Sequence, residues 1–208
     1  MKEYLSIQRS TGTLFREIPG AYIWDKLDGS SCRSEWTRKA GWFKHGRRHG
    51  LLDDSNPQLA EVPALFESLL AEPLTRLAHN QRWQHLIVFY EFWGGKSIAG
   101  LHTPGDTKYL TVFDAAANKQ GFLGPRAFRE TFEGVVETPR FLGIENWTRG
   151  FVECVRLSQV EGITFEGVVA KAGIKHDIVR AKAKTQAWVD EVIRVHGEMA
   201  GRKLVESL

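Results

Sequence analysis

Cysteine is scarce in this chain of 208 residues, which contains only Cys32 and Cys154. Two cysteines form neither a disulfide framework nor a metal-binding quartet, so we interpret both as ordinary thiols of a reducing compartment. No apolar run approaches the roughly 18 to 20 residues that span a bilayer, and the first residues lack the apolar stretch of a secretory signal. Low-complexity tracts are also missing, which excludes a fibrous or disordered chain. We therefore expect a soluble, cytoplasmic protein.

Charge is unevenly distributed along the chain. The net charge is +3, but residues 33–48 carry +5 and the rest of the chain −2. The basic residues of this segment are Arg33, Arg38, Lys39, Lys44, Arg47 and Arg48. Trp36, Trp42 and Phe43 lie among them, and basic side chains mixed with aromatic ones suit a polyanion with stackable bases. A solvated hairpin whose aromatic side chains point into the core is the alternative.

Apolar residues make up 42% of the chain, enough for the core of a single domain over residues 1–208. Residue patterns predict strands over 21–24, 85–93, 108–114 and 162–171, and a hairpin of residues 31–36 and 42–44. Glu91 and Glu166 are charged residues inside two of these strands, where burial is expected. The turn that follows the first strand places Lys26 at a strand end.

Helices are predicted in three places. Pro63 suits a first helical turn before an apolar face formed by Leu65, Phe66, Leu69 and Leu70, and Pro73 should end or kink that helix. Residues 125–132 form a short helix in this interpretation. The last predicted helix packs through apolar residues at steps of four, three and four, which are Trp188, Val192, Val195 and Met199.

Five short motifs follow one another in the chain. They are KLDGS at 26–30, YEF at 90–92, VFD at 112–114, EGVVAK at 166–171 and KAK at 182–184. Each is weak alone, but in this order the sequence resembles the covalent nucleotidyltransferase superfamily of ATP-dependent RNA and DNA ligases and mRNA capping enzymes. The resemblance covers about residues 22–184. It implies an α+β nucleotidyltransferase core, built from antiparallel sheets flanked by helices around an ATP cleft.

The resemblance implies that Lys26 is the catalytic nucleophile. Lys26 would attack the α-phosphorus of ATP, expel pyrophosphate and carry AMP as a phosphoramidate. Because a free lysine amine is scarce at neutral pH, we expect neighbouring cations such as Lys182, Lys184 and a bound Mg²⁺ to lower the pKa of Lys26. The same cations would stabilise charge on the phosphoryl oxygens.

The other motif residues receive their roles from the same resemblance. Lys182 and Lys184 would contact the α-phosphate, although an exposed strand face is the alternative. Glu166 would position Mg²⁺ or Mn²⁺, unless it forms a structural ion pair. Glu91 would accept a hydrogen bond from the ribose 2′-hydroxyl, and Phe113 would stack on adenine unless it only packs in the core.

Three further assignments are less specific. The resemblance places Asp25 and Leu27 beside the adenine edge. A basic contact between the first and third motifs falls on Lys44 or Arg47.

Two departures from the family pattern are visible. DNA ligases and capping enzymes usually carry arginine five residues after the nucleophile, where this chain has Ser31, with Arg33 two residues further on. KLDGS with a Tyr-Glu-Phe third motif looks closer to bacteriophage-type RNA ligases. Only 24 residues follow Lys184, so we expect no C-terminal oligonucleotide-binding barrel.

The function implied is an ATP-dependent RNA ligase that joins 5′-phosphate and 3′-hydroxyl ends through lysyl-AMP and adenylylated-polynucleotide intermediates. A minimal DNA nick ligase, a non-catalytic nucleic-acid-binding relative and a catalytic subunit with a partner chain stay open as alternatives. The expected partners are RNA ends, with DNA or hybrid nicks as alternatives. The residues expected to bind nucleic acid are Arg33, Arg38, Lys39, Arg47 and Arg48.

Overall fold

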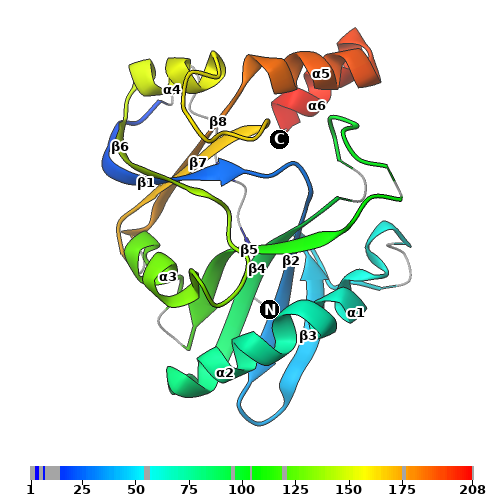
Figure 1. The fold of residues 1–208 in the computed structure, drawn as a ribbon, viewed down its shortest axis with the longest axis vertical. Coiled ribbons are helices and arrows are strands. Elements are labelled where there is room, and N and C mark those ends of the chain that lie inside the picture. Colours follow the sequence, from blue (N-terminus) through cyan, green and yellow to red (C-terminus); the bar gives the residue numbers. More distant parts are fainter. Residues whose placement is uncertain are drawn as a thin grey trace.

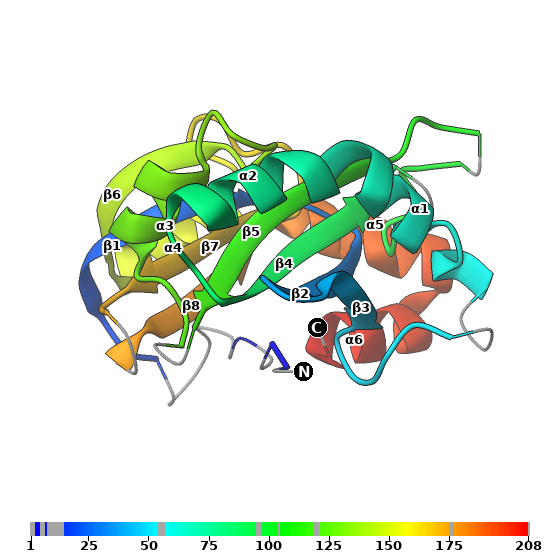
Figure 2. The same ribbon diagram turned by 90° about the horizontal axis from the view of Figure 1, so that it is seen from below.

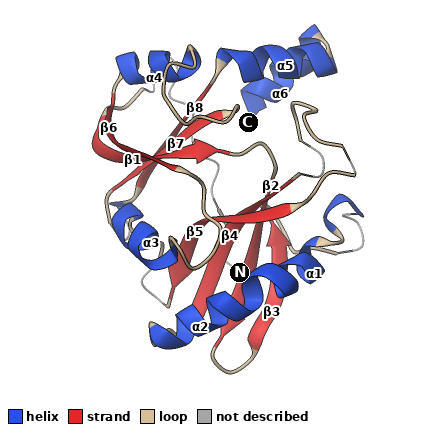
Figure 3. Ribbon diagram, in the orientation of Figure 1, coloured by secondary structure: helices blue, strands red, loops and turns tan. Residues whose placement is uncertain are grey.

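The computed structural model describes residues 3–4, 7, 15–53, 57–94, 97–103, 105–118, 121–174 and 177–207. These residues form two four-stranded antiparallel sheets with helices packed against them, so the α+β prediction is confirmed (Figure 1). Figure 3 separates the two sheets by colour from the helices around them. Within these residues no helix combines the length and apolar character needed to cross a membrane.

Sheet A has the strand order β6-β1-β7-β8. Its strands are β1 (Ile18–Lys26), β6 (Phe141–Trp147), β7 (Gly167–Ala172) and β8 (Val179–Lys184). Helix α4 (Arg149–Arg156) buries Val155 against one face of this sheet, together with Ile23 and Trp147. Small side chains on that face, such as Ala170 and Ala181, let the helix approach closely.

Sheet B has the order β3-β2-β4-β5. Its strands are β2 (Ser30–Thr37), β3 (Gly41–Arg47), β4 (His85–Trp93) and β5 (Tyr109–Ala117). One face packs on a helical segment of α1 (Val62–Phe66), a π-helical turn (Glu67–Ala71) and α2 (Glu72–Asn80), and on α3 (Pro125–Phe132) (Figure 2). A 3₁₀ turn (Pro57–Leu59) precedes α1. The opposite face of sheet B is turned toward the pocket described below.

Pro73 does not end its helix, which was one of the two outcomes predicted from the sequence, but the helix is irregular directly before it. The chain stays helical from Val62 to Asn80, and Pro73 lies in the first turn of α2, directly after the π-helical turn. Proline has no N–H to donate to the carbonyl four residues earlier and collides with it. A wider π-type turn relieves that contact, so the helix continues through the proline.

Two further predictions are wrong in part. Residues 162–166 are irregular, so Glu166 precedes β7 instead of lying at its centre. The C-terminal helix is two helices, α5 (Gln186–His196) and α6 (Glu198–Ser207), separated by Gly197 at φ +80°. This left-handed conformation favours glycine and interrupts the apolar periodicity. Consequently Trp188 and Val192 are buried, whereas Met199 is 88% exposed.

Candidate active site

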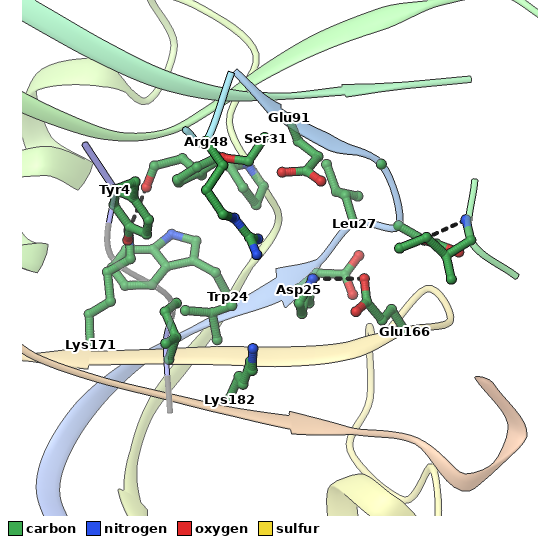
Figure 4. Close-up of a pocket in the computed structure, with 18 residues that line it drawn as sticks. Tyr4, Trp24, Asp25, Leu27, Ser31, Arg48, Glu91, Glu166, Lys171 and Lys182 are labelled. Atoms are coloured by element: carbon green, nitrogen blue, oxygen red, sulfur yellow. Dashed lines mark hydrogen bonds and ion pairs between the residues drawn. The ribbon is translucent and has the colours of Figure 1, made fainter. Parts of the chain in front are cut away.

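A pocket lies between the two sheets, where the chain passes from one to the other. β1 ends at Lys26 in sheet A, and after three intervening residues β2 begins at Ser30 in sheet B. Gly29 makes this crossing possible, because a Cβ there would lie 2.4 Å from the carbonyl oxygen of Phe92. In Figure 4 Arg48 and Glu91 enter the pocket from the side of sheet B, and Lys182 enters from the side of sheet A.

Lys26 and Glu166 form an ion pair in this pocket. The Lys26 Nζ donates to Glu166 Oε2 at 2.8 Å, and Lys184 Nζ lies 3.3 Å from the other oxygen of the same carboxylate. Glu166 is 4% exposed, so two cations balance a buried anion, as a buried carboxylate requires. The motifs at residues 26, 166 and 184 therefore meet in space although 140 residues separate Lys26 from Glu166.

The charge state of Lys26 differs from the expectation. Burial lowers its pKa, but the carboxylates of Glu166 and Glu91 outweigh burial, so the pKa of Lys26 is raised above its ordinary value. The predicted lowering of this pKa by Lys182 and Lys184 is therefore wrong, because the carboxylates have the larger effect. Lys26 rests as a protonated amine held by Glu166.

Lys182 and Glu91 have strongly shifted pKa values. Burial, assisted by the positive charges of Lys26, Lys184 and Arg48, lowers the pKa of Lys182 to about 7. Burial, with Glu166 adding a like charge, raises the pKa of Glu91 to about 7 against the opposing effect of Lys26 and Arg48. Both groups line the pocket, and shifted groups gathered in a cleft are typical of functional sites.

Strand β8 presents alternate basic side chains toward the pocket side of sheet A. Lys182 lines the pocket and Lys184 contacts Glu166, so the two lysines share one strand face as their spacing predicts. Arg180, two residues earlier, pairs with Asp114 at 3.0 Å. The strand thus contributes two cations beside Lys26 and one to a neighbouring ion pair.

A β-bulge brings two consecutive residues of β5 to the pocket face of sheet B. Val112 of β5 pairs with Tyr90 of β4, and Asp114 pairs with the adjacent residue of β4, Phe89. Phe113 lies between them as the additional residue of the bulge. Phe113 therefore lines the pocket. Asp114 accepts a hydrogen bond from the Tyr4 hydroxyl at 2.9 Å, which holds Tyr4 against the same wall.

Lys171 and Trp24 complete the aromatic end of the pocket. The Lys171 Nζ donates to the carbonyl oxygen of Phe113 and lies 5.3 Å from the centre of the Trp24 ring. It also lies 3.2 Å from Asp114. Trp24, Phe113 and Tyr4 form an aromatic wall of the pocket around the Lys171 ammonium, with the Tyr4 and Phe113 rings inclined at 79°, and such a wall suits a purine ring.

Asp25 and Leu27 line the pocket beside Lys26. The Asp25 carboxylate accepts hydrogen bonds from the N–H and hydroxyl groups of Thr164, so this side chain ties the loop before Glu166 to the end of β1. Burial raises the pKa of Asp25. Its position is thus defined by a structural contact, with its backbone at the pocket wall.

Asp28 has a role that the sequence did not indicate. Its carboxylate accepts hydrogen bonds from the N–H groups of Ile98 at 3.2 Å and Ala99 at 3.0 Å, and from Trp188 Nε1 at 3.1 Å. These contacts fasten the turn after Lys26 to the loop after β4 and to helix α5. The Asp-Gly pair at residues 28–29 indicates a turn in the sequence. It does not reveal the hydrogen-bond partners of Asp28, because Ile98 and Trp188 lie 70 and 160 residues away.

The basic segment 33–48 does not form one surface. Arg33 is 3% exposed, and it donates to the carbonyl oxygens of Arg48 at 2.8 Å and Gly50 at 3.2 Å. Lys44 and Arg47 are exposed, and because they are three residues apart on β3 they point to opposite faces of the sheet. The concentration of basic residues in this segment therefore does not produce a single basic face, because strand alternation directs Lys44 and Arg47 to opposite sides of the sheet.

The remaining basic residues of the segment lie at two distant places. Arg38 and Lys39 are at the hairpin turn, the end of sheet B away from Lys26. Arg48 lines the pocket, whereas Lys44 and Arg47 are not among the residues that line it. Arg33, expected at a nucleic-acid surface, instead supports the loop from which Arg48 extends.

The acidic side chains of the pocket fit a Mg²⁺ or Mn²⁺ ion that is shared with phosphates. Among the described residues no group of three or more His, Cys, Asp and Glu side chains could hold a metal alone. Mg²⁺, however, is usually bound through one or two carboxylates, retained waters and substrate phosphates. Glu166, with Glu91 across the pocket, supplies such a partial oxygen set.

No protein-family model matches the sequence, and no curated protein matches it. Solved structures do match the fold. An RNA ligase from Naegleria gruberi with AMP and manganese superposes with a TM-score of 0.59 at 16% identity, over 83% of this chain and 52% of that one. The same enzyme with ATP and manganese covers 84% of this chain and 51% of that chain, again at 0.59 and 16% identity.

An archaeal ATP-dependent RNA ligase gives a TM-score of 0.59 at 14% identity, over 91% of this chain and 50% of that one. The fold is that of ATP-dependent RNA ligases. This confirms the nucleotidyltransferase architecture expected from the motifs. The present chain spans about half the length of these ligases. Closeness to the bacteriophage-type enzymes stays a prediction.

Proposed function

We propose that this chain is the nucleotidyltransferase domain of an ATP-dependent RNA ligase, with Lys26 as the nucleophile. One observation carries the proposal: Lys26 lies between two carboxylates and two further cations in a pocket with an aromatic end, inside a fold shared with RNA ligases. In the first reaction, the Lys26 Nζ forms a bond to the α-phosphorus of ATP. The bond from that phosphorus to the bridging oxygen breaks, and pyrophosphate leaves.

The side chains of the pocket have distinct tasks in this reaction. Phe113 and Trp24 hold the adenine, Glu91 accepts from the ribose, and Lys182, Lys184 and Arg48 bind phosphate oxygens. Lys26 must lose its proton before attack. A divalent ion held by Glu166 would neutralise that carboxylate, which removes the interaction that keeps Lys26 protonated.

Two later reactions complete ligation in this proposal. AMP moves from Lys26 to a 5′-phosphate end, and a 3′-hydroxyl then attacks that phosphate and displaces AMP. Lys44 and Arg47 are exposed on β3, the strand that leads to Arg48, and are our candidates for contacts with the polynucleotide backbone. Arg38 and Lys39 lie further along the same hairpin and would contact a longer polynucleotide.

The test is self-labelling with α-labelled ATP and Mg²⁺, followed by denaturing electrophoresis. Wild type should carry acid-labile label and Lys26→Ala should carry none, whereas Lys39→Ala, a matched change far from the pocket, should label normally. Absence of label on AMP-free wild type would contradict the proposal. A nick with RNA or DNA on its 3′-hydroxyl side then distinguishes an RNA ligase from a DNA ligase.

A further inference from the structure

Beyond the pocket, the same face of sheet B continues into a pair of aromatic rings, the partly buried Trp93 and the exposed Tyr109. Glu91 lines the pocket, and Trp93, two residues later on β4, points to the same side. Trp93 pairs in register with Tyr109 at the start of β5. Their rings stack with centres 4.5 Å apart at 21°.

This pair is rigid and directly adjoins the loop that carries the nucleophile. Trp93 Nε1 donates to Thr111 Oγ1 at 2.7 Å, which fixes the indole. The turn at Gly29 packs against the Cβ of Trp93. Tyr109 is nevertheless 42% exposed. An ordered aromatic ring is therefore open to solvent beside the site of Lys26.

The charged groups around the pair provide no excess of positive charge. His102, whose ring centre is 6.0 Å from that of Trp93, pairs with Asp106 at 3.4 Å. Lys108, next to Tyr109, pairs with Glu61 at 2.7 Å. These two ion pairs offer no excess positive charge to bind a phosphate. The stacked rings do offer a flat surface on which a neutral ring can stack.

We propose that Trp93 and Tyr109 form a stacking platform for an unpaired nucleobase next to the RNA end being joined. The inference rests on the proposed function, which brings a polynucleotide end to Lys26. The adenine wall at Phe113 and the platform at Tyr109 lie four residues apart on β5, which corresponds to about 13 Å along a strand. The platform is thus continuous with the nucleotide pocket but distinct from the adenine wall.

The experiment measures the binding of a single-stranded, 5′-phosphorylated RNA to the full chain, together with self-labelling by ATP. Tyr109→Ala should weaken RNA binding by about 5- to 150-fold, the usual range for loss of one base stack. Tyr109→Phe should bind like wild type, because it keeps the ring. Leu101→Ala changes a similarly exposed apolar side chain outside the ring pair and should also bind like wild type.

Replacing the terminal nucleotides one at a time by abasic residues completes a double-mutant cycle. At one position the abasic RNA should bind wild type more weakly, but Tyr109→Ala equally well with or without the base. If Tyr109→Ala labels itself and binds RNA like wild type, the platform is refuted while the ligase proposal stands. If wild type does not label itself, the ligase proposal fails, and the platform as an RNA-end site fails with it.

Discussion

The contact between Arg33 and the loop of Arg48 predicts a specific effect on nucleotide binding. Arg33 is buried and donates to the carbonyl oxygens of Arg48 and Gly50, and Arg48 extends from this loop into the pocket. Replacing Arg33 by Met removes both hydrogen bonds but retains an unbranched side chain. We expect the loop to lose its position and Arg48 to leave the pocket.

The magnitude follows from the two lost hydrogen bonds. A hydrogen bond from a charged donor contributes about 1.5 to 3 kcal/mol, so Arg33→Met should lower the free energy of unfolding by about 3 kcal/mol or more. For a chain of this size the melting temperature should fall by at least about 6 °C. Loss of one charged contact from Arg48 to phosphate should raise the KM for ATP by about 10- to 150-fold.

The decisive assay is ATP binding as a function of pH in Arg33→Met and Arg48→Met. The positive charge of Arg48 helps to lower the pKa values of both Lys182 and Glu91. Its loss should raise both, so the pH midpoint of ATP binding should move upward in both variants, whereas only Arg33→Met should lose stability. Arg33→Lys should restore part of both properties. If Arg33→Met is destabilised but keeps the wild-type KM and pH midpoint, Arg33 does not position Arg48.

Three further predictions follow from the pocket. Because Lys182 has a pKa of about 7 and is charged only below it, ATP affinity measured by calorimetry should fall as the pH rises above 7, and Lys182→Met should flatten this dependence. Glu166→Gln removes the anion that raises the pKa of Lys26, so an amine-acylating reagent should modify Lys26 faster at neutral pH in this variant than in wild type. An unchanged rate, read by peptide mass spectrometry, would refute that assignment. Asp28→Asn weakens the contacts to the loop after β4 and to Trp188, so it should lower the free energy of unfolding by about 2 kcal/mol in urea titrations; an unchanged midpoint would contradict the anchoring role.

The elements with strong residue patterns were predictable from the sequence. Strand β4 has the predicted bounds because nine residues that are almost all apolar or aromatic suit only a buried strand. Strand β6 and helix α4 were not predicted. β6 is largely exposed and contains Gly143, so it has no apolar periodicity, and α4 has only one fully buried residue, Val155. Such elements are stabilised by tertiary contacts that local patterns do not contain.

The sequence predicts those residues of the candidate site whose direction is determined by the order of the motifs and by the alternation of side chains along a strand. Lys182 and Glu91 reach the pocket because each occupies a fixed face of a well-defined strand. Arg48 follows the end of β3, where alternation no longer applies, and its direction depends on the buried Arg33. Tyr4 reaches the pocket through its hydrogen bond to Asp114, 110 residues away, and through ring contacts with Phe89 and Phe113. A side chain placed by a loop or by a distant partner leaves no periodic signal in the sequence.

The two lysines nearest the pocket centre show why residue type alone does not determine reactivity. Lys26 contacts the Glu166 carboxylate at 2.8 Å, and its pKa is raised. Lys182 faces three cations, and the same burial lowers its pKa to about 7. The cations expected to activate Lys26 thus act mainly on Lys182 in the protein without nucleotide. In the proposed reaction, Lys26 would therefore become a nucleophile only after the charge on Glu166 is neutralised, which would link its reactivity to occupation of the pocket.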